Sequence, residues 1–160
     1  MSAKASVLFV CLGNICRSPT AEGVFRARAA RRGLDGLVAV DSAGTGDWHV
    51  GDPPDRRAIA AAAKRGYDLA PLRARQVGPD DFRRFGWILA MDRANLRDLA
   101  AMQPREFAGH LGLFLDVAPS LDVRDVPDPY YGGADGFERV LDLVEAASDA
   151  LVDRIAATRR

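Results

Sequence analysis

The sequence predicts a single α/β domain in which a four-stranded parallel sheet is covered by helices on both faces. The chain has 160 residues, a suitable length for one compact domain, and 48% of them are hydrophobic, which is enough to form a core. Short apolar runs alternate with segments of helical periodicity from one end to the other. No linker rich in Pro or Ser interrupts this alternation, so we expect one domain over residues 1–160.

Four short apolar runs predict the strands, because such runs are typical of parallel strands buried on both faces. They cover residues 6–10, 37–41, 86–91 and 111–115. Helical spacing predicts helices over residues 19–32 and 55–65, and a third over residues 92–102 with Asp92 as its N-cap. Asp135 and Glu138 form a D-x-x-E capping box for a last helix that runs to the C-terminus. Strand and helix alternate four times, which favours parallel strands with right-handed crossovers.

Composition argues against several classes of function. The 22 Lys and Arg balance the 22 Asp and Glu, whereas proteins that bind the nucleic-acid backbone usually carry a basic excess, so no nucleic-acid partner is expected. No run approaches 18 apolar residues, so we expect no membrane span. His49 and His110 are too few and too far apart for a metal site, and no cofactor is expected. The glycine motifs of nucleotide-binding proteins are absent after the first strand.

Two cysteines cannot form a framework of secreted disulfides. The cytoplasm is therefore the expected location, with export by a route that needs no signal peptide left open. Both cysteines lie in the segment that follows the first strand, where open α/β sheets bind their ligands. This segment reads Cys11-Leu12-Gly13-Asn14-Ile15-Cys16-Arg17-Ser18.

A loop between a strand and a helix N-terminus can turn its backbone N–H groups inward and form a nest for an anion. Such a nest favours Cys11 as a thiolate nucleophile, and the planar fork of Arg17 can hold two oxygens of a phosphoryl group. Gly13 is expected to allow a backbone geometry that a Cβ would resist, and Asn14 to brace the loop. The Ser18 hydroxyl can hydrogen-bond the leaving thiolate. The loop therefore indicates phosphoryl transfer through a cysteine.

The motif V-C-L-G-N-I-C-R-S-P over residues 10–19 resembles the active-site loop of the low-molecular-weight protein tyrosine phosphatases. The similarity covers nearly the whole chain, including D-S-A-G-T at residues 41–45 and D-P-Y-Y-G at residues 128–132. It implies a metal-independent enzyme that acts on phosphotyrosine in protein substrates, with phosphate as product and inhibitor. One departure is Pro127, which stands where an acidic residue is expected.

The resemblance also assigns roles to individual residues. Cys11 would form a phosphocysteine, held by Arg17 and the backbone amides of residues 12–17. Asp128 would protonate the leaving group and later activate water. Ser42 would hold Asn14 in place. The walls of the pocket would be formed by aromatic side chains that stack on a phenyl phosphate, namely Trp48, Tyr130 and Tyr131.

Two regulatory hypotheses concern the same residues. Cys16 lies within the loop and can close a reversible disulfide with Cys11 under peroxide, which would protect the nucleophile from further oxidation. Tyr130 and Tyr131 are candidate targets of tyrosine kinases.

Three alternative functions require residues that can be compared with this sequence. A thioredoxin-coupled arsenate reductase needs further cysteines along the chain, and none follows Cys16. A protein-arginine phosphatase on the same scaffold usually carries Thr at the position of Ile15 and lacks the paired aromatic residues, so Ile15 with Tyr130 and Tyr131 favours phosphotyrosine. A catalytically idle phosphoprotein-binding module is disfavoured because no group required for turnover is missing.

Overall fold

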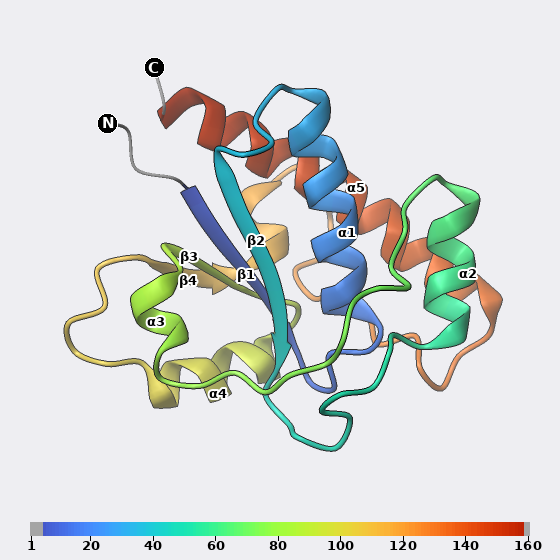
Figure 1. The fold of residues 1–160 in the computed structure, drawn as a ribbon, viewed down its shortest axis with the longest axis horizontal. Helices are drawn as coiled ribbons and strands as arrows, with labels where there is room; N and C mark the ends of the chain where they lie inside the picture. Colours follow the sequence, from blue (N-terminus) through green and yellow to red (C-terminus); the bar gives the residue numbers. More distant parts are fainter. Residues whose placement is uncertain (1–4, 159–160) are drawn as a thin grey trace.

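A parallel sheet with strand order β2-β1-β3-β4 lies at the centre of the molecule (Figure 1). The computed structural model describes residues 5–158, so the expected domain of residues 1–160 extends beyond it at both ends. The strands are β1 (Ala5–Cys11), β2 (Val38–Gly44), β3 (Trp87–Ala90) and β4 (His110–Leu113). The predicted α/β fold with a four-stranded parallel sheet is confirmed.

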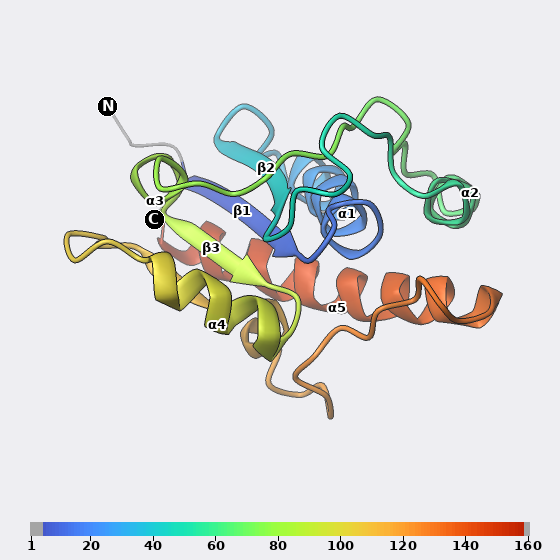
Figure 2. The same cartoon turned by 90° about the horizontal axis from the view of Figure 1, so that it is seen from below.

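Helices cover both faces of the sheet, as Figure 2 shows from below. They are α1 (Arg17–Arg31), α2 (Arg56–Lys64), α3 (Asp81–Arg84), α4 (Arg93–Met102), α5 (Ala134–Thr158) and a 3-10 turn, η1 (Phe114–Val117). Because side chains alternate along a strand, β1 supplies both halves of the core. Val7 and Phe9 pack into the half with α1 and α5, whereas Leu8 and Val10 pack into the half with α3 and α4.

Helix starts are fixed by side-chain caps at two places near the site. The Asp55 carboxylate accepts a hydrogen bond from the backbone N–H of Arg57 at 2.8 Å and begins α2. Asp92 accepts one from the backbone N–H of Asn95 at 2.8 Å and begins α4, as predicted. Both carboxylates also bind an arginine side chain, Asp55 that of Arg57 and Asp92 that of Arg17.

Three details of the sequence prediction are wrong. Residues 111–115 are not one strand, because β4 ends at Leu113 and the chain continues as η1. Asp135 is not an N-cap: α5 already begins at Ala134, and the Glu138 carboxylate binds Arg65 at 2.7 Å instead. The short helix α3 was missed. In addition, α1 starts two residues earlier than predicted, and β2 continues to Gly44.

The parallel arrangement places the carboxyl ends of all four strands at one edge of the sheet. At this edge β1 ends at Cys11, between the end of β2 at Gly44 and the end of β3 at Ala90. A loop leaving the central strand can therefore be contacted from several elements at once. Within residues 5–158, none of the helices combines the length and the apolar character needed to cross a membrane.

Candidate active site

The loop of residues 12–16 joins β1 to α1, and the side chains of most of its functional residues are buried. Cys11 Sγ lies 3.0 Å from Ser18 Oγ and accepts a hydrogen bond from the backbone N–H of Asn14 at 3.2 Å. Both contacts stabilise negative charge on sulfur, since an O–H and an N–H can donate to it. The sulfur thus lies beside the first turn of a helix, where the helix dipole also favours an anion.

Asn14 holds the loop in shape through its side chain. Its Nδ2 donates to Ser18 Oγ at 2.8 Å and to Ser42 Oγ at 3.0 Å, and its Oδ1 accepts from the backbone N–H of Arg75 at 3.0 Å. Because Ser18 Oγ accepts from Asn14, its own hydrogen can point at Cys11 Sγ. Asn14 also has a positive φ of 58°, in the left-handed region. Asn tolerates this region better than most residues, which explains its use here.

The role expected for Gly13 needs correction, because the left-handed backbone lies at Asn14 and not at Gly13. A Cβ at Gly13 would instead approach the His49 ring to 3.1 Å. Glycine is required more strictly at Gly44, where a Cβ would lie 2.7 Å from the carbonyl oxygen of Leu12. This close approach lets the Gly46 N–H donate to the Leu12 carbonyl at 2.9 Å. The segment that follows β2 is therefore hydrogen-bonded to the loop.

A second layer of polar groups lies behind Asn14. Ser42 Oγ donates to the Glu22 carboxylate at 2.7 Å, and burial raises the pKa of Glu22 while the hydrogen bond from Ser42 opposes this shift. The Arg75 guanidinium binds Asp41 at 3.0 Å and the buried Asp81 at 2.9 Å. These ion pairs fix the backbone of Arg75, whose N–H holds Asn14.

Arg17 is buried, and its guanidinium is held by three groups from distant parts of the chain. Nη1 donates to Asp92 at 2.6 Å and to the carbonyl oxygen of Val126 at 3.1 Å, and Nη2 lies 3.7 Å from Asp128. Burial opposes the charged form, but the negative charge of Cys11 and the hydrogen bond to Asp92 raise the pKa of Arg17 above its ordinary value. A permanent cation therefore lies beside the nucleophile.

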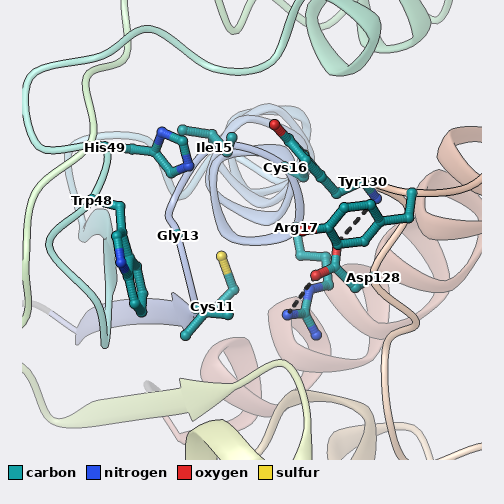
Figure 3. Close-up of a pocket in the computed structure, with 11 residues that line it drawn as sticks. Cys11, Gly13, Ile15, Cys16, Arg17, Trp48, His49, Asp128 and Tyr130 are labelled. Carbon is teal, nitrogen blue, oxygen red and sulfur yellow. Dashed lines mark hydrogen bonds and ion pairs between the residues drawn. The ribbon is translucent and has the colours of Figure 1, made fainter.

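The carboxylate predicted as the acid faces the same cavity from a loop that follows η1. Asp128 is 43% exposed at its side chain, and its Oδ1 accepts a hydrogen bond from the backbone N–H of Tyr130 at 3.0 Å. Figure 3 shows Cys11 between Trp48 on one side and Asp128 with Tyr130 on the other. The pocket holds about 440 Å³, and its lining includes Cys11, Arg17, Asp128, Trp48, Tyr130 and Tyr131.

The aromatic side chains differ in how far they project into solvent. Trp48 is 69% exposed, Tyr130 is 39% exposed and Tyr131 is 93% exposed, and the two tyrosine rings meet edge to face at 4.9 Å. An aromatic rim around a small polar floor suits a flat ring that carries an anionic group. His49 also lines the pocket, and its Nδ1 lies 3.2 Å from the Asp52 carboxylate.

Cys16 lies in the loop but differs from Cys11 in its surroundings. Both cysteines are free and buried. Burial, followed by the negative charges of Asp55 and Cys11, raises the pKa of Cys16 to about 12. Cys16 is therefore a neutral thiol at physiological pH and reacts slowly as a nucleophile. The reversible disulfide with Cys11 stays a prediction.

The loop is recognisable in the sequence, but its partners from other parts of the chain are not. Asp92 was expected only as a helix cap, and Arg75, Asp81 and Arg57 were not singled out. Their signal is spatial, because Asp92 lies 75 residues and Arg75 lies 61 residues from their partners in the loop. Among residues 5–158, no group of three or more His, Cys, Asp or Glu side chains is placed to hold a metal ion.

This arrangement can perform one kind of chemistry well. A cysteine sulfur, a guanidinium held by an ion pair and a partly exposed carboxyl group surround a cavity that opens between aromatic side chains. The cation suits an anionic substrate, and the carboxyl group lies where it can exchange a proton with a leaving group.

Comparisons with known proteins agree with this geometry. The family model of low molecular weight phosphotyrosine protein phosphatase matches residues 6–160. A low molecular weight protein-tyrosine-phosphatase of Streptomyces coelicolor is 49% identical over 91% of this chain and 90% of its own. The corresponding YfkJ protein of Bacillus subtilis is 43% identical over 94% and 95%, and its crystal structure superposes with a TM-score of 0.92 over 99% of both chains. The chain therefore belongs to the low molecular weight phosphotyrosine protein phosphatase family.

Proposed function

We propose that the protein hydrolyses phosphotyrosine in protein substrates in two steps, through a phosphocysteine intermediate. The observation that carries this proposal is the placement of Cys11, Arg17 and Asp128 around one aromatic-rimmed pocket. Cys11 is the nucleophile, Arg17 holds the phosphoryl group and Asp128 transfers protons. Family membership supports the reaction, and the contacts of these side chains support their roles.

In the first step the Cys11 thiolate attacks phosphorus in line with the bond to the tyrosine oxygen. The S–P bond forms as the P–O bond breaks, and protonated Asp128 donates its proton to the departing phenolate. Arg17 and the backbone amides of residues 12–17 bind the equatorial oxygens most tightly in the transition state. The Asp92 carboxylate holds the guanidinium in one orientation, so little reorganisation is needed when the substrate binds.

In the second step a water molecule attacks the phosphocysteine. Asp128, now ionised, takes a proton from this water, and the S–P bond breaks to release phosphate and the Cys11 thiolate. Ser18, 3.0 Å from the sulfur, donates a hydrogen bond to the thiolate as it leaves. Phosphate is therefore the product, and we expect it to inhibit by occupying the same loop.

The rim favours phosphotyrosine over phosphoarginine. Trp48 and Tyr130 lie on opposite sides of Cys11, and a phenyl ring can lie between them. The apolar Ile15 side chain lines the same pocket, and it has no hydroxyl group that could bind the guanidinium of a phosphoarginine substrate. A protein-arginine phosphatase on the same scaffold is the second candidate, with an idle phosphoprotein-binding module as the third.

The proposal is tested by phosphate release from matched phosphotyrosine, phosphoserine and phosphoarginine peptides, without added metal. Cys11→Ser is the blank, and we expect it to abolish turnover while it keeps its affinity for inorganic phosphate in calorimetry. We expect turnover with the phosphotyrosine peptide alone. Preference for phosphoarginine would overturn the assignment of substrate but not that of the nucleophile. Turnover by Cys11→Ser near the wild-type rate would overturn the mechanism.

A further inference from the structure

The loop that carries Asp128 is exposed, and besides Arg17 a side chain of α2 also holds it in place. The Arg57 guanidinium donates through Nη2 to the carbonyl oxygen of Tyr130 at 2.9 Å. It also lies 5.5 Å from the centroid of the Tyr130 ring and 4.8 Å from that of Phe137, at the start of α5. Arg57 therefore contacts the backbone and the ring of the residue that directly supports the Asp128 carboxylate.

The same guanidinium is also anchored to Asp55, and its Nη2 is shared between Asp55 and the Tyr130 carbonyl. Nε donates to Oδ1 of Asp55 at 3.1 Å and Nη2 donates to Oδ2 at 3.0 Å, a two-point contact that Lys cannot reproduce. Hydrogen bonding from Arg57 lowers the pKa of Asp55, so both groups stay ionised at neutral pH. The backbone N–H of Asp55 in turn donates to the carbonyl oxygen of Ile15 at 2.8 Å, within the loop of the nucleophile.

These contacts form a continuous path between the two halves of the site. It begins at Ile15 in the phosphate-binding loop and continues through Asp55 and Arg57 to the carbonyl of Tyr130. It ends at Asp128, whose Oδ1 accepts from the Tyr130 N–H at 3.0 Å. A shift of the Tyr130 backbone would therefore move the carboxyl group relative to the phosphorus atom.

We propose that Arg57 is a positioning residue that sets the distance of the Asp128 carboxyl group from the phosphate-binding loop, and with it the efficiency of proton transfer to the leaving group. This inference rests on the function proposed above. Arg57 does not reach the reacting atoms itself. Its side chain is 47% exposed and that of Asp55 is 12% exposed, so its replacement should cost some stability at the start of α2 and leave the core of the fold in place.

The experiment compares two small substrates that differ in their need for an acid. Phenyl phosphate has a poor leaving group and needs a proton from Asp128, whereas p-nitrophenyl phosphate has a good one. For Arg57→Gln we expect kcat/KM, which reports only the steps up to release of the phenol, to fall about tenfold with phenyl phosphate and less than about twofold with p-nitrophenyl phosphate, because a misplaced Asp128 impairs proton transfer to the poor leaving group. The second step is common to both substrates and does not enter this comparison. Arg57→Lys should show a smaller loss with phenyl phosphate than Arg57→Gln, because it keeps the positive charge but lacks the planar guanidinium that binds two acceptors at once.

The neighbouring Arg56 provides a matched control, because it is an exposed arginine in the first turn of the same helix. Arg56→Gln removes the same charge, and we expect it to keep the wild-type ratio of the two kcat/KM values. Thermal unfolding of all variants checks that the fold is retained. An equal loss of kcat/KM with both substrates, or no loss with either, would overturn the role of Arg57.

A double variant separates this inference from the proposed function. Asp128→Asn alone should show a strong dependence on the leaving group, and adding Arg57→Gln to it should change the ratio no further. If Asp128→Asn shows this dependence and Arg57→Gln does not, the proposed function stands and the inference about Arg57 fails. If Asp128→Asn shows no dependence on the leaving group, the general acid is wrongly assigned and both fail.

Discussion

The two sides of the pocket are held in place by contrasting means. On the nucleophile side, the functional side chains are buried and each has partners from other elements; these side chains are Cys11, Asn14, Arg17 and Ser18. On the acid side, Asp128 and the tyrosines are exposed, and the loop is held by the contacts of Val126 and Arg57. The molecule therefore buries the residues proposed to bind the phosphoryl group and leaves the proposed proton donor at the surface.

The difference predicts how substitutions divide between stability and turnover. A buried polar group that loses its partner costs about 1–3 kcal/mol, so changes on the nucleophile side should affect both the free energy of unfolding and kcat. Exposed hydrogen bonds and ion pairs contribute much less, so changes on the acid side should affect kcat or KM alone. The following variants test this division, in order of decreasing effect on turnover.

Arg17→Lys should have the largest effect. The ammonium group cannot bind Asp92, the Val126 carbonyl and two phosphate oxygens at once, so we expect kcat for p-nitrophenyl phosphate to fall about a thousandfold. The melting temperature should fall as well, because Asp92 loses a short ion pair. Arg97→Lys, at an exposed position of α4, is the control. A loss of less than tenfold would contradict the view that the guanidinium is the clamp.

Asn14→Ala should affect both quantities. It removes the hydrogen bonds to Ser18, Ser42 and the Arg75 backbone, and it puts a Cβ-bearing residue without local hydrogen bonds at a φ of 58°. We expect the free energy of unfolding to fall by about 3 kcal/mol and kcat by about tenfold to a hundredfold. Asn14→Gly removes the strain of a positive φ but still lacks the side-chain hydrogen bonds. Urea denaturation of the two variants therefore separates the contribution of backbone strain from that of the hydrogen bonds. Equal stability of Asn14→Ala and wild type would show that the network is dispensable.

Tyr130→Ala and Tyr131→Ala should differ on the acid side. Tyr130 is 39% exposed and lies against Arg57, whereas Tyr131 is 93% exposed. We expect KM for phenyl phosphate to rise about fivefold in Tyr130→Ala and less than about twofold in Tyr131→Ala, because only the better-held ring provides a fixed wall. Neither variant should change the urea midpoint. A larger rise in KM for Tyr131→Ala would reverse the assignment of the walls.

Cys16→Ala should leave turnover within about twofold of wild type, since a neutral thiol takes no part in the proposed steps. Its effect is on the pH dependence of stability. The pKa of Cys16 is raised from 9.0 to about 12 in the folded state, so the unfolded chain loses this proton first as pH rises. The stability due to the buried thiol is complete below pH 9 and is lost between about pH 9 and 12. Wild type should therefore lose more stability than Cys16→Ala in this range, as measured by urea denaturation at a series of pH values.

The sequence predicted most of the fold because its signals are local. Apolar runs and helical spacing located the strands and the long helices, and Asp92 was identified correctly as a cap. The four-residue helix α3 escaped because it is too short to show periodicity. Asp135 was wrongly identified as a cap, since α5 already begins before it and its partner in the expected capping box, Glu138, binds Arg65 instead.

The part of the candidate site that lies in one continuous segment could be predicted for a similar reason. Residues 11–18 contain the proposed nucleophile, the arginine and the hydrogen-bond donors within eight positions. Asp128 could be selected among the many aspartates only through its resemblance to a known motif. The side chains that hold the two loops of the site could not be predicted from the sequence. Arg57 contacts a residue 73 positions away, and the chain contains many arginines, so no local pattern indicates which arginine makes this contact.

The exposed indole at the mouth of the pocket gives the protein an optical reporter of its own. The chain has two tryptophans, and the second, Trp87, begins β3 at the opposite end of the sheet and packs against His110. A ligand that covers Trp48 would change the polarity around one fluorophore while the other supplies a constant background. Binding to variants that cannot turn over can therefore be followed by intrinsic emission, without any label.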